Sequence, residues 1–241
     1  MIATCAIDLR SGRTVGRNAD AVVPAASTVK PLISIALWRA IDAGTVDPRL
    51  RIPAGELPVP GGGGLAASLD AGTELCPADL DLLMLAVSDN AATNALLDML
   101  GVDAVNAEAT RLGLAGTRVR RLMGDEAAIA AGRENTTTAG DLARIVETLA
   151  TERHRRTLAA MGESHHRDII PSLLPGDGLV IDCKQGDLPG RVRHDMALID
   201  DGERPVALAV CSAPPATAMG LAQVAAALYR EVRRSPALAS G

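Results

Sequence analysis

The chain contains 241 residues, of which 48% are hydrophobic, and its formal net charge is −5. This length and apolar content suffice to bury a sizeable core in one domain or in two interlocked domains. The chain is acidic overall and lacks the excess of basic residues that is typical of a nucleic-acid-binding protein. With one Trp, one Tyr and no Phe, the chain also lacks aromatic platforms on which bases could stack. We therefore expect no nucleic-acid partner and a core of aliphatic side chains.

The sequence carries no sign of a membrane or of a metal. No apolar run approaches the roughly 18 residues that a membrane span needs, and the N-terminus lacks the pattern of a signal peptide. We predict a cytoplasmic protein without a membrane partner, with a secreted mature form as the alternative. The four cysteines, at positions 5, 76, 183 and 211, form no Cys-x-x-Cys or Cys/His cluster. We expect four buried thiols, with a disulfide as the alternative, and no bound metal.

The hydrophobic pattern is typical of strands at both ends of the chain and of helices in between. Residues 2–9 and 13–18 are predicted to form a hairpin, and strand patterns return at 178–184, 191–200 and 205–212. Helical periodicity covers a larger set of ranges: 27–43, 77–87, 91–100, 102–112, 139–150 and 217–233. Residues 46–75, which include Gly61 to Gly64, and residues 113–137 are predicted to be loops.

This order of elements predicts an α/β (α+β) fold with an antiparallel sheet built from both chain ends, flanked by helices and interrupted by a helical lobe. The predicted sheet domain is discontinuous and comprises residues 1–25 and 176–241. The predicted helical domain comprises residues 26–175 and carries Ser27 and Ser88.

The segment Ser27-Thr28-Val29-Lys30 places a serine and a lysine three residues apart at the start of a predicted helix. Side chains at this spacing are neighbours, with Cβ atoms roughly 5–6 Å apart. A serine hydroxyl needs a base to become a nucleophile, and a lysine can serve once burial or nearby positive charge lowers its pKa. Taken alone, the same four residues fit a helix cap followed by a solvated lysine.

Two further segments contain polar groups that suit a catalytic cleft. Ser88-Asp89-Asn90 lies between two predicted helices, where a hydroxyl and an amide can relay a proton and hold a substrate amide. Lys184-Gln185-Gly186 ends a predicted strand, where a lysine can place charge over a cleft and a glycine lets a substrate lie along the strand. Each segment alone also fits an ordinary helix cap or an edge-strand lysine.

Together, Ser-x-x-Lys, Ser-Asp-Asn and Lys-Gln-Gly resemble in order and spacing the motifs of the penicillin-recognising serine enzymes, specifically the class A β-lactamase-like group. Residues 132–139 resemble the Thr-rich segment that closes the omega loop of that family, and residues 188–190 and 193–195 also resemble its members. The resemblance spans nearly the whole chain. It implies a β-lactamase/transpeptidase-like fold and a hydrolase that acts on a β-lactam or related amide through an acyl-enzyme, without a cofactor.

The resemblance also implies a role for each matching residue. Ser27 would attack the carbonyl, Lys30 would take the proton of Ser27, and Ser88 would pass a proton to the leaving nitrogen. Lys184 would attract a substrate carboxylate, and the backbone N–H groups of Ser27 and Asp187 would form the oxyanion hole. The positions implied to bind the substrate are Asn90, Gln185, Gly186 and Asp187.

Two departures from the family pattern bear on function. Gln185 stands where the family usually has a threonine that helps to hold a substrate carboxylate. Glu126 lies where the deacylating glutamate is sought, but Ala130 replaces the usual asparagine four residues later, and Asp125 and Glu134 are rival bases. If water is not activated, the acyl-enzyme is long-lived. The alternatives are therefore a biosynthetic acyltransferase or esterase of the cytoplasm, or a non-catalytic ligand-binding relative.

Overall fold

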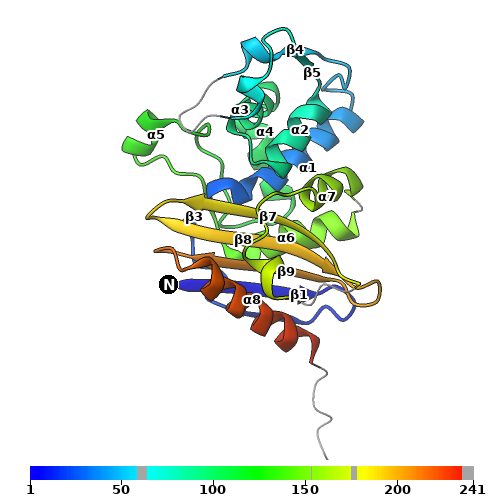
Figure 1. The fold of residues 1–241 in the computed structure, drawn as a ribbon, viewed down its shortest axis with the longest axis vertical. Coiled ribbons are helices and arrows are strands. Elements are labelled where there is room, and N and C mark those ends of the chain that lie inside the picture. Colours follow the sequence, from blue (N-terminus) through cyan, green and yellow to red (C-terminus); the bar gives the residue numbers. More distant parts are fainter. Residues whose placement is uncertain (59–63, 153, 175–177, 235–241) are drawn as a thin grey trace, which may run out of the picture.

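A computed structural model of the chain describes residues 1–58, 64–152, 154–174 and 178–234. A sheet lies below a lobe of helices, and segments from both ends of the chain lie side by side in the sheet (Figure 1). The strands are β1 (Ile2–Asp8), β2 (Thr14–Arg17), β3 (Val23–Pro24), β4 (Ile52–Pro53), β5 (Glu74–Leu75), β6 (Thr136–Thr137), β7 (Val180–Leu188), β8 (Val192–Asp200) and β9 (Val206–Ser212). The α-helices are α1 (Lys30–Asp42), α2 (Pro77–Ala86), α3 (Asn90–Leu100), α4 (Val102–Arg111), α5 (Glu126–Ala130), α6 (Ala139–Thr151), α7 (Arg155–Gly162) and α8 (Ala218–Arg233). Short 3-10 helices are η1 (Ala26–Val29), η2 (Ala54–Glu56), η3 (Ala66–Ser68) and η4 (Ile170–Leu173).

The main sheet has five antiparallel strands in the order β2-β1-β9-β8-β7. β1 from the start of the chain pairs with β9 from its end over the whole length of both strands. This arrangement confirms the predicted antiparallel sheet made from both termini. It also leaves β7 at one edge of the sheet, with a free side next to the helical lobe.

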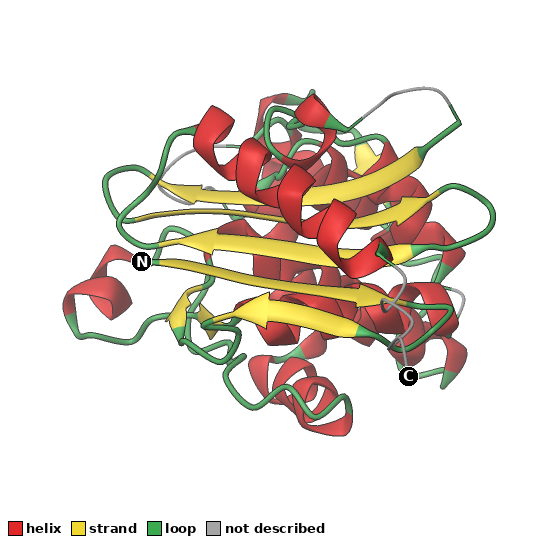
Figure 2. Cartoon of the chain, turned by 90° about the horizontal axis from the view of Figure 1, so that it is seen from below, coloured by secondary structure: helices red, strands yellow, loops and turns green. Residues whose placement is uncertain are grey.

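Helices cover both faces of the sheet, because strands β1 and β9 are apolar on both sides. Alternate residues of a strand point to opposite faces. Cys5 and Ile7 belong to the core shared with α6, whereas Ala6 belongs to the core under α8. Figure 2 shows α8 lying across the strands. Alanines such as Ala225 on α8 let the helix approach closely, and each larger aliphatic side chain buried contributes roughly 1.5–3 kcal/mol.

The helical lobe is organised around α1, whose Leu32, Ile33, Ile35 and Leu37 are fully buried. The predicted helix over 27–43 is divided in the structure: η1 forms the first turn, and α1 begins only at Lys30. Pro31 then stands in the first turn of α1, where a backbone N–H is not needed. Pro31 therefore coincides with a division of the predicted helix, whose first turn is the 3-10 turn that carries Ser27.

Several predictions of local structure differ from what is observed. β7 continues to Leu188, so Lys184 lies inside the strand and not at its end. The predicted loop over 113–137 contains α5 and β6, and α7 was not predicted. Of the predicted loop at 61–64, residues 61–63 lie outside the described residues. α6 belongs to the predicted helical domain yet packs on the sheet, and the predicted domain division remains a prediction.

The four cysteines are free thiols, so the alternative of a disulfide is not observed. Cys5, Cys183 and Cys211 are buried as expected, whereas Cys76 is partly exposed. Within the described residues, no helix combines the length and apolarity required to cross a bilayer. The cytoplasmic location remains a prediction.

Candidate active site

Ser27 lies on η1, which packs against the edge strand β7 at Gly186. A Cβ atom on Gly186 would lie 2.8 Å from the backbone nitrogen of Ser27 and 2.9 Å from that of Thr28. Any larger residue would therefore push β7 away from the nucleophile. Ala26, directly before Ser27, has φ +48°, a conformation that L-residues other than glycine seldom adopt. The turn that presents Ser27 is thus both strained and tightly packed.

Lys30 is fully buried, and its ammonium nitrogen has three acceptors. Nζ donates to the carbonyl oxygen of Ser88 at 2.7 Å, to Oδ1 of Asn90 at 2.9 Å and to Oγ of Ser88 at 3.1 Å. Burial, and after it the positive charge of Lys184, holds the pKa of Lys30 well below its ordinary range, although Asp89 acts in the opposite direction. A lysine whose pKa is lowered in this way can accept the proton of a nearby hydroxyl.

Ser88 links the two lysines of the site. Its backbone has φ +59°, which turns the residue away from the end of α2 toward Lys30. Oγ of Ser88 lies 3.1 Å from Nζ of Lys30 and 2.9 Å from Nζ of Lys184. A hydroxyl oxygen has two lone pairs, and both are used when each lysine donates to it. The hydroxyl proton of Ser88 is then left to donate to a third group.

Lys184 reaches Ser88 from the middle of β7. It is fully buried, and its Nζ also donates to the carbonyl oxygen of Gln185 at 3.1 Å. Burial lowers the pKa of Lys184 to about 8, and the negative charge of Asp195 limits the decrease. At neutral pH Lys184 therefore keeps its proton, and two lysines with different proton affinity share one hydroxyl.

Buried hydrogen bonds fix the loop that carries Ser88 and Asn90. The Asp89 carboxylate caps α3 by accepting from the N–H of Ala92 at 2.8 Å, and its second oxygen accepts from the N–H of Ala66 at 2.8 Å. This is the ordinary helix cap that the sequence of Ser88-Asp89-Asn90 also fits. Because the cap holds the start of α3, it also holds Asn90 against Lys30.

Two buried polar groups on the sheet have no hydrogen-bond partner among the described residues. They are Nε2 of Gln185 and Oδ1 of Asp195. The two residues are directly opposed in the β7–β8 ladder and therefore share one face of the sheet. Oδ2 of Asp195 accepts from the N–H of Ile170 at 2.9 Å, and burial raises the pKa of Asp195 to about 7. Asp195 therefore joins the start of η4 to β8, the strand next to the one that carries Lys184.

His194 has a structural position on β8. Its Nε2 lies 2.8 Å from the carbonyl oxygen of Pro24, and its Nδ1 accepts from the N–H of Ser212 at 3.2 Å. Nε2 therefore carries the proton and donates to Pro24. Burial lowers the pKa of His194, so the ring stays neutral. It ties the sheet to the segment that leads into Ser27.

These elements enclose a cavity of about 300 Å³ at the free edge of β7. Both predicted serines open onto it, and the residues that line it are Ser27, Ser88, His166, Asp168, Gln185, Asp187 and Arg193. The structure thus brings together Ser27, Lys30, Ser88, Asn90 and Lys184, with Gly186 at the contact between η1 and β7. A larger hollow of about 520 Å³ between α8 and the β1–β2 edge contains none of the predicted site residues.

The structure does not bring the three candidate bases of the predicted omega loop into this cavity. Glu126 is exposed on the first turn of α5, which projects from the side of the lobe (Figure 1). Asp125 caps the same helix by accepting from the N–H of Ala128. Glu134 lies 2.5 Å from Arg121 and 2.8 Å from Arg191. Burial alone would raise the pKa of Glu134, but the two arginines hold this pKa below its ordinary value.

Sequence reasoning missed four residues near the nucleophile. His166, Asp168 and Arg193 line the cavity, and Asp195 supports it from behind. The sequence could have indicated Asp195, because burying a charged residue within an otherwise apolar strand costs free energy unless the charge is paired or hydrogen-bonded. His166 and Asp168 had none, since they lie in an irregular segment whose path depends on tertiary contacts.

A buried lysine pair that shares one serine, together with a second serine that follows a strained residue at a helix start, is the arrangement of a serine acyl-transfer enzyme of the penicillin-recognising class. The chain matches the β-lactamase enzyme family over residues 2–232 and belongs to that family. It is a serine β-lactamase-like hydrolase of mixed α/β fold. Among curated proteins, none is significantly similar to the chain.

Solved structures show the same fold. The β-lactamase from Sphaerobacter thermophilus DSM 20745 is 29% identical, with a TM-score of 0.86 and coverage of 98% of this chain and 93% of that one. PBP-A is 26% identical, with a TM-score of 0.83 and coverage of 96% and 89%. A mutant of PBP-A has been solved as an acyl-enzyme complex with penicillin G. A β-lactamase from Xanthomonas campestris pv. campestris str. ATCC 33913, 24% identical at a TM-score of 0.82 over 96% and 91%, shares the fold.

Proposed function

We propose that the protein opens a β-lactam or a related amide through an acyl-enzyme on Ser27, and that release of the acyl group is the slow step. The observation that carries this proposal is the shared hydroxyl of Ser88, which lies within hydrogen-bond distance of both Lys30 and Lys184. This network supports a complete path for one proton. The relative PBP-A, which in mutant form holds penicillin G as an acyl-enzyme, supports the same chemistry.

In the proposed acylation, neutral Lys30 takes the proton of the Ser27 hydroxyl while the Ser27 oxygen forms a bond to the substrate carbonyl carbon. The C–N bond of the amide then breaks, and the leaving nitrogen takes the hydroxyl proton of Ser88. Lys30 returns a proton to Ser88 across the 3.1 Å contact. No net proton is gained or lost, and Ser27 is left as an ester.

Deacylation requires water to attack this ester, which releases a carboxylate and restores Ser27. A positioned base accelerates such a step by about 10²- to 10⁴-fold. None of Asp125, Glu126 and Glu134 lines the cavity in the described structure, so the position of these carboxylates supports a long-lived acyl-enzyme. The proposed enzyme is accordingly a slow hydrolase.

The test is to incubate the protein with a fluorescent penicillin and to follow its intact mass over time, with Ser27→Ala as the control. We expect the mass of one penicillin to be added to the wild-type protein and to be lost slowly, whereas the variant stays unlabelled. Rapid loss of the adduct would show fast water attack and overturn the proposed slow step. No adduct at any concentration would favour the non-catalytic alternative and overturn the proposal.

A further inference from the structure

The segment that contains His166 is tied to both sides of the cavity. The N–H of His165 donates to the carbonyl oxygen of Ala86, the last residue of α2, at 3.0 Å. The carbonyl oxygen of His166 accepts from the thiol of Cys183, which precedes Lys184 on β7, at 3.5 Å. The imidazole of His166 therefore lies in the cavity wall together with both serines of the site.

The imidazole of His166 is a neutral base at neutral pH. Burial, and after it the positive charge of Lys184, lowers the pKa of the ring, although Asp168 acts in the opposite direction. A neutral imidazole has one ring nitrogen with a lone pair, which can accept a proton from water. Histidine is the side chain that most often acts as a general base in enzymes.

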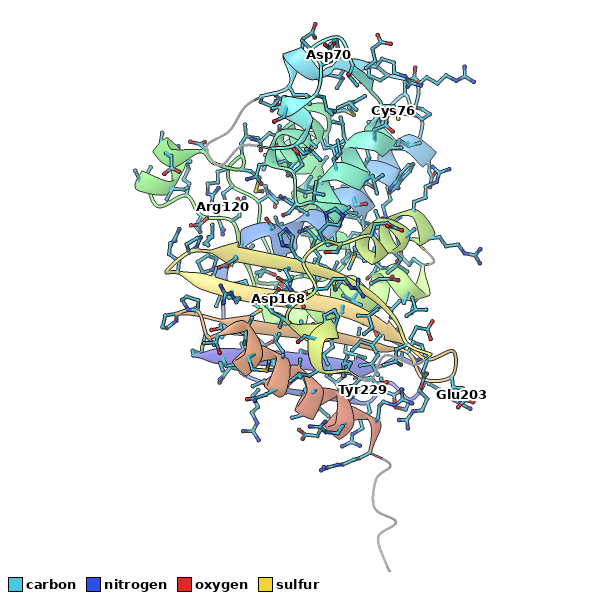
Figure 3. The ribbon with its side chains drawn as sticks, in the orientation of Figure 1. Asp70, Cys76, Arg120, Asp168, Glu203 and Tyr229 are labelled. Carbon is cyan, nitrogen blue, oxygen red and sulfur yellow. The ribbon has the colours of Figure 1, made fainter. Side chains whose placement is uncertain are left out.

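The other ionisable groups at the cavity are less suited to activate water. Lys30 and Lys184 are fully buried and do not line the cavity in the described structure. Asp187 is paired with Arg193 at 2.9 Å. Asp168 lines the cavity on the same segment as the histidine, and Figure 3 labels it at the level of the sheet. Carboxylates are weaker bases than imidazole, so the histidine is the better acceptor of a proton from water.

We propose that His166 is a catalytic residue of deacylation and takes a proton from the water that attacks the ester on Ser27. As the water oxygen bonds to the carbonyl carbon, a ring nitrogen of His166 accepts one proton of the water. The bond between that carbon and the Ser27 oxygen then breaks, and His166 returns the proton to this oxygen. The acyl group leaves as a carboxylic acid and gives the second proton of the water to solvent. This inference rests on the proposed acylation of Ser27 and names the residue that ends each turnover.

A base that no other group orients fits a slow hydrolase. Within the described part of the chain, His166 makes hydrogen bonds to Ser164 and Cys183 through backbone atoms alone. Its side chain is exposed. In efficient sites a third group orients the base. A ring without such a partner is correctly placed for part of the time, so it contributes less than the roughly 10²- to 10⁴-fold of a positioned base.

The decay of an adduct that has already formed tests this role. The full-length protein is acylated with benzylpenicillin, the excess is removed and the intact mass is followed, so that differences in acylation do not enter. We expect His166→Gln to lengthen the life of the adduct about tenfold, because an amide does not accept a proton at neutral pH. His165→Gln is the matched control, because it removes the adjacent exposed imidazole, which does not line the cavity. Its adduct should decay at the wild-type rate.

The pH dependence of the decay distinguishes a base from a structural role. The decay should slow as the pH falls through the pKa of His166, below the ordinary value of 6.5, because the ring then holds a proton. Asp195 also titrates, at a pH of about 7, so the acidic decrease is assigned by its loss in His166→Gln. The charged or titratable groups around this ring are His165 and Asp168 on its own segment, Lys184 and Asp187 on β7, Arg193 on β8 and Lys30 on α1.

The outcomes distinguish the two proposals. If benzylpenicillin forms no adduct with the wild-type protein, the proposed function fails, and the role of His166 fails with it. If the adduct forms but decays equally fast in His166→Gln, the function stands and the inference is overturned. An acidic decrease that persists in His166→Gln, or equal slowing in His165→Gln, would overturn it as well. Both side chains are exposed, so the fold should tolerate these changes.

Discussion

Acylation and deacylation depend on two regions of the molecule whose charged side chains have different partners. Between α1 and β7, two buried lysines converge on Ser88, and nearly every polar group has a partner. In residues 121–135, the carboxylates bind elsewhere: Glu134 binds arginines and Asp125 caps α5. The difference teaches that acylation and deacylation are built independently. A chain can retain the first set of contacts without bringing any of the three predicted bases into the cavity.

The strongest way to break this comparison is Lys30→Met, which keeps the length of the side chain and removes the amine. We expect acylation of Ser27 to slow by about a thousandfold, because the step loses its base and the partner of Ser88. The rate of adduct formation by intact mass measures the effect. A melting temperature close to that of the wild-type protein is the control for folding. Labelling at the wild-type rate would assign the base to another group.

Gly186→Ala tests whether the close contact of β7 with η1 matters for the nucleophile. The added Cβ would lie 2.8 Å from the nitrogen of Ser27, so the strand or the turn must shift. We expect acylation to fall about a hundredfold, as for a small misplacement of reacting groups, and the free energy of unfolding to fall by about 1–3 kcal/mol.

Gly72→Ala is the matched control, because its Cβ would meet only Asp70 at 3.4 Å, an ordinary contact. It should change neither acylation nor the midpoint of denaturant unfolding by a measurable amount. Equal behaviour of Gly186→Ala and Gly72→Ala would show that the approach of β7 to Ser27 has no part in acylation.

The pH dependence of acylation tests the charge on Lys184. Its pKa of about 8 lies below the ordinary value of 10.5, so its proton is present at neutral pH and is lost as the pH rises through about 8. We expect the acylation rate to decrease above that pH, by up to about tenfold per pH unit. Rate constants measured from acidic to alkaline pH give this limb directly.

Asp195→Asn tests whether Lys184 is the group whose titration causes the alkaline decrease in acylation rate. The carboxylate of Asp195 raises the pKa of Lys184, so its removal should move the alkaline limb to lower pH. A limb that does not move would show that another group titrates. The neutral variant also retains an oxygen that can accept from the N–H of Ile170, so the start of η4 should keep its position.

The sequence predicted the parts of the molecule that depend on local pattern or on short motifs. The hydrophobic pattern predicted the strands at both ends of the chain. The spacing of three motifs and their resemblance to a known family identified Ser27, Lys30, Ser88 and Lys184. The length of β7 was missed, because Gly186 and the charged residue after it interrupt the strand pattern, although β8 pairs with them.

The part of the cavity wall that Asp168 forms depended on tertiary structure. Asp168 lies far from Ser27 in the chain, in an irregular segment that Asp195 holds through Ile170. No periodicity identifies such a residue. Glu126 was misjudged for the same reason. Its place in the sequence suggested a catalytic base, but the motif does not show that α5 holds Glu126 outside the cavity wall.

The smallest effect is expected for Glu126→Gln, and it tests the comparison most directly. If Glu126 activated water, its loss would lengthen the life of the acyl-enzyme by about 10²-fold or more. Its exposed position at the start of α5, outside the cavity wall, leads us to expect no change in adduct lifetime. Asp98→Asn, which removes an exposed carboxylate from α3 outside the cavity wall, is the control for removing one carboxylate. Because the reporter is the decay of an adduct that has already formed, a change confined to Glu126→Gln would mean that α5 moves over the cavity after acylation, and the two regions would then act as one.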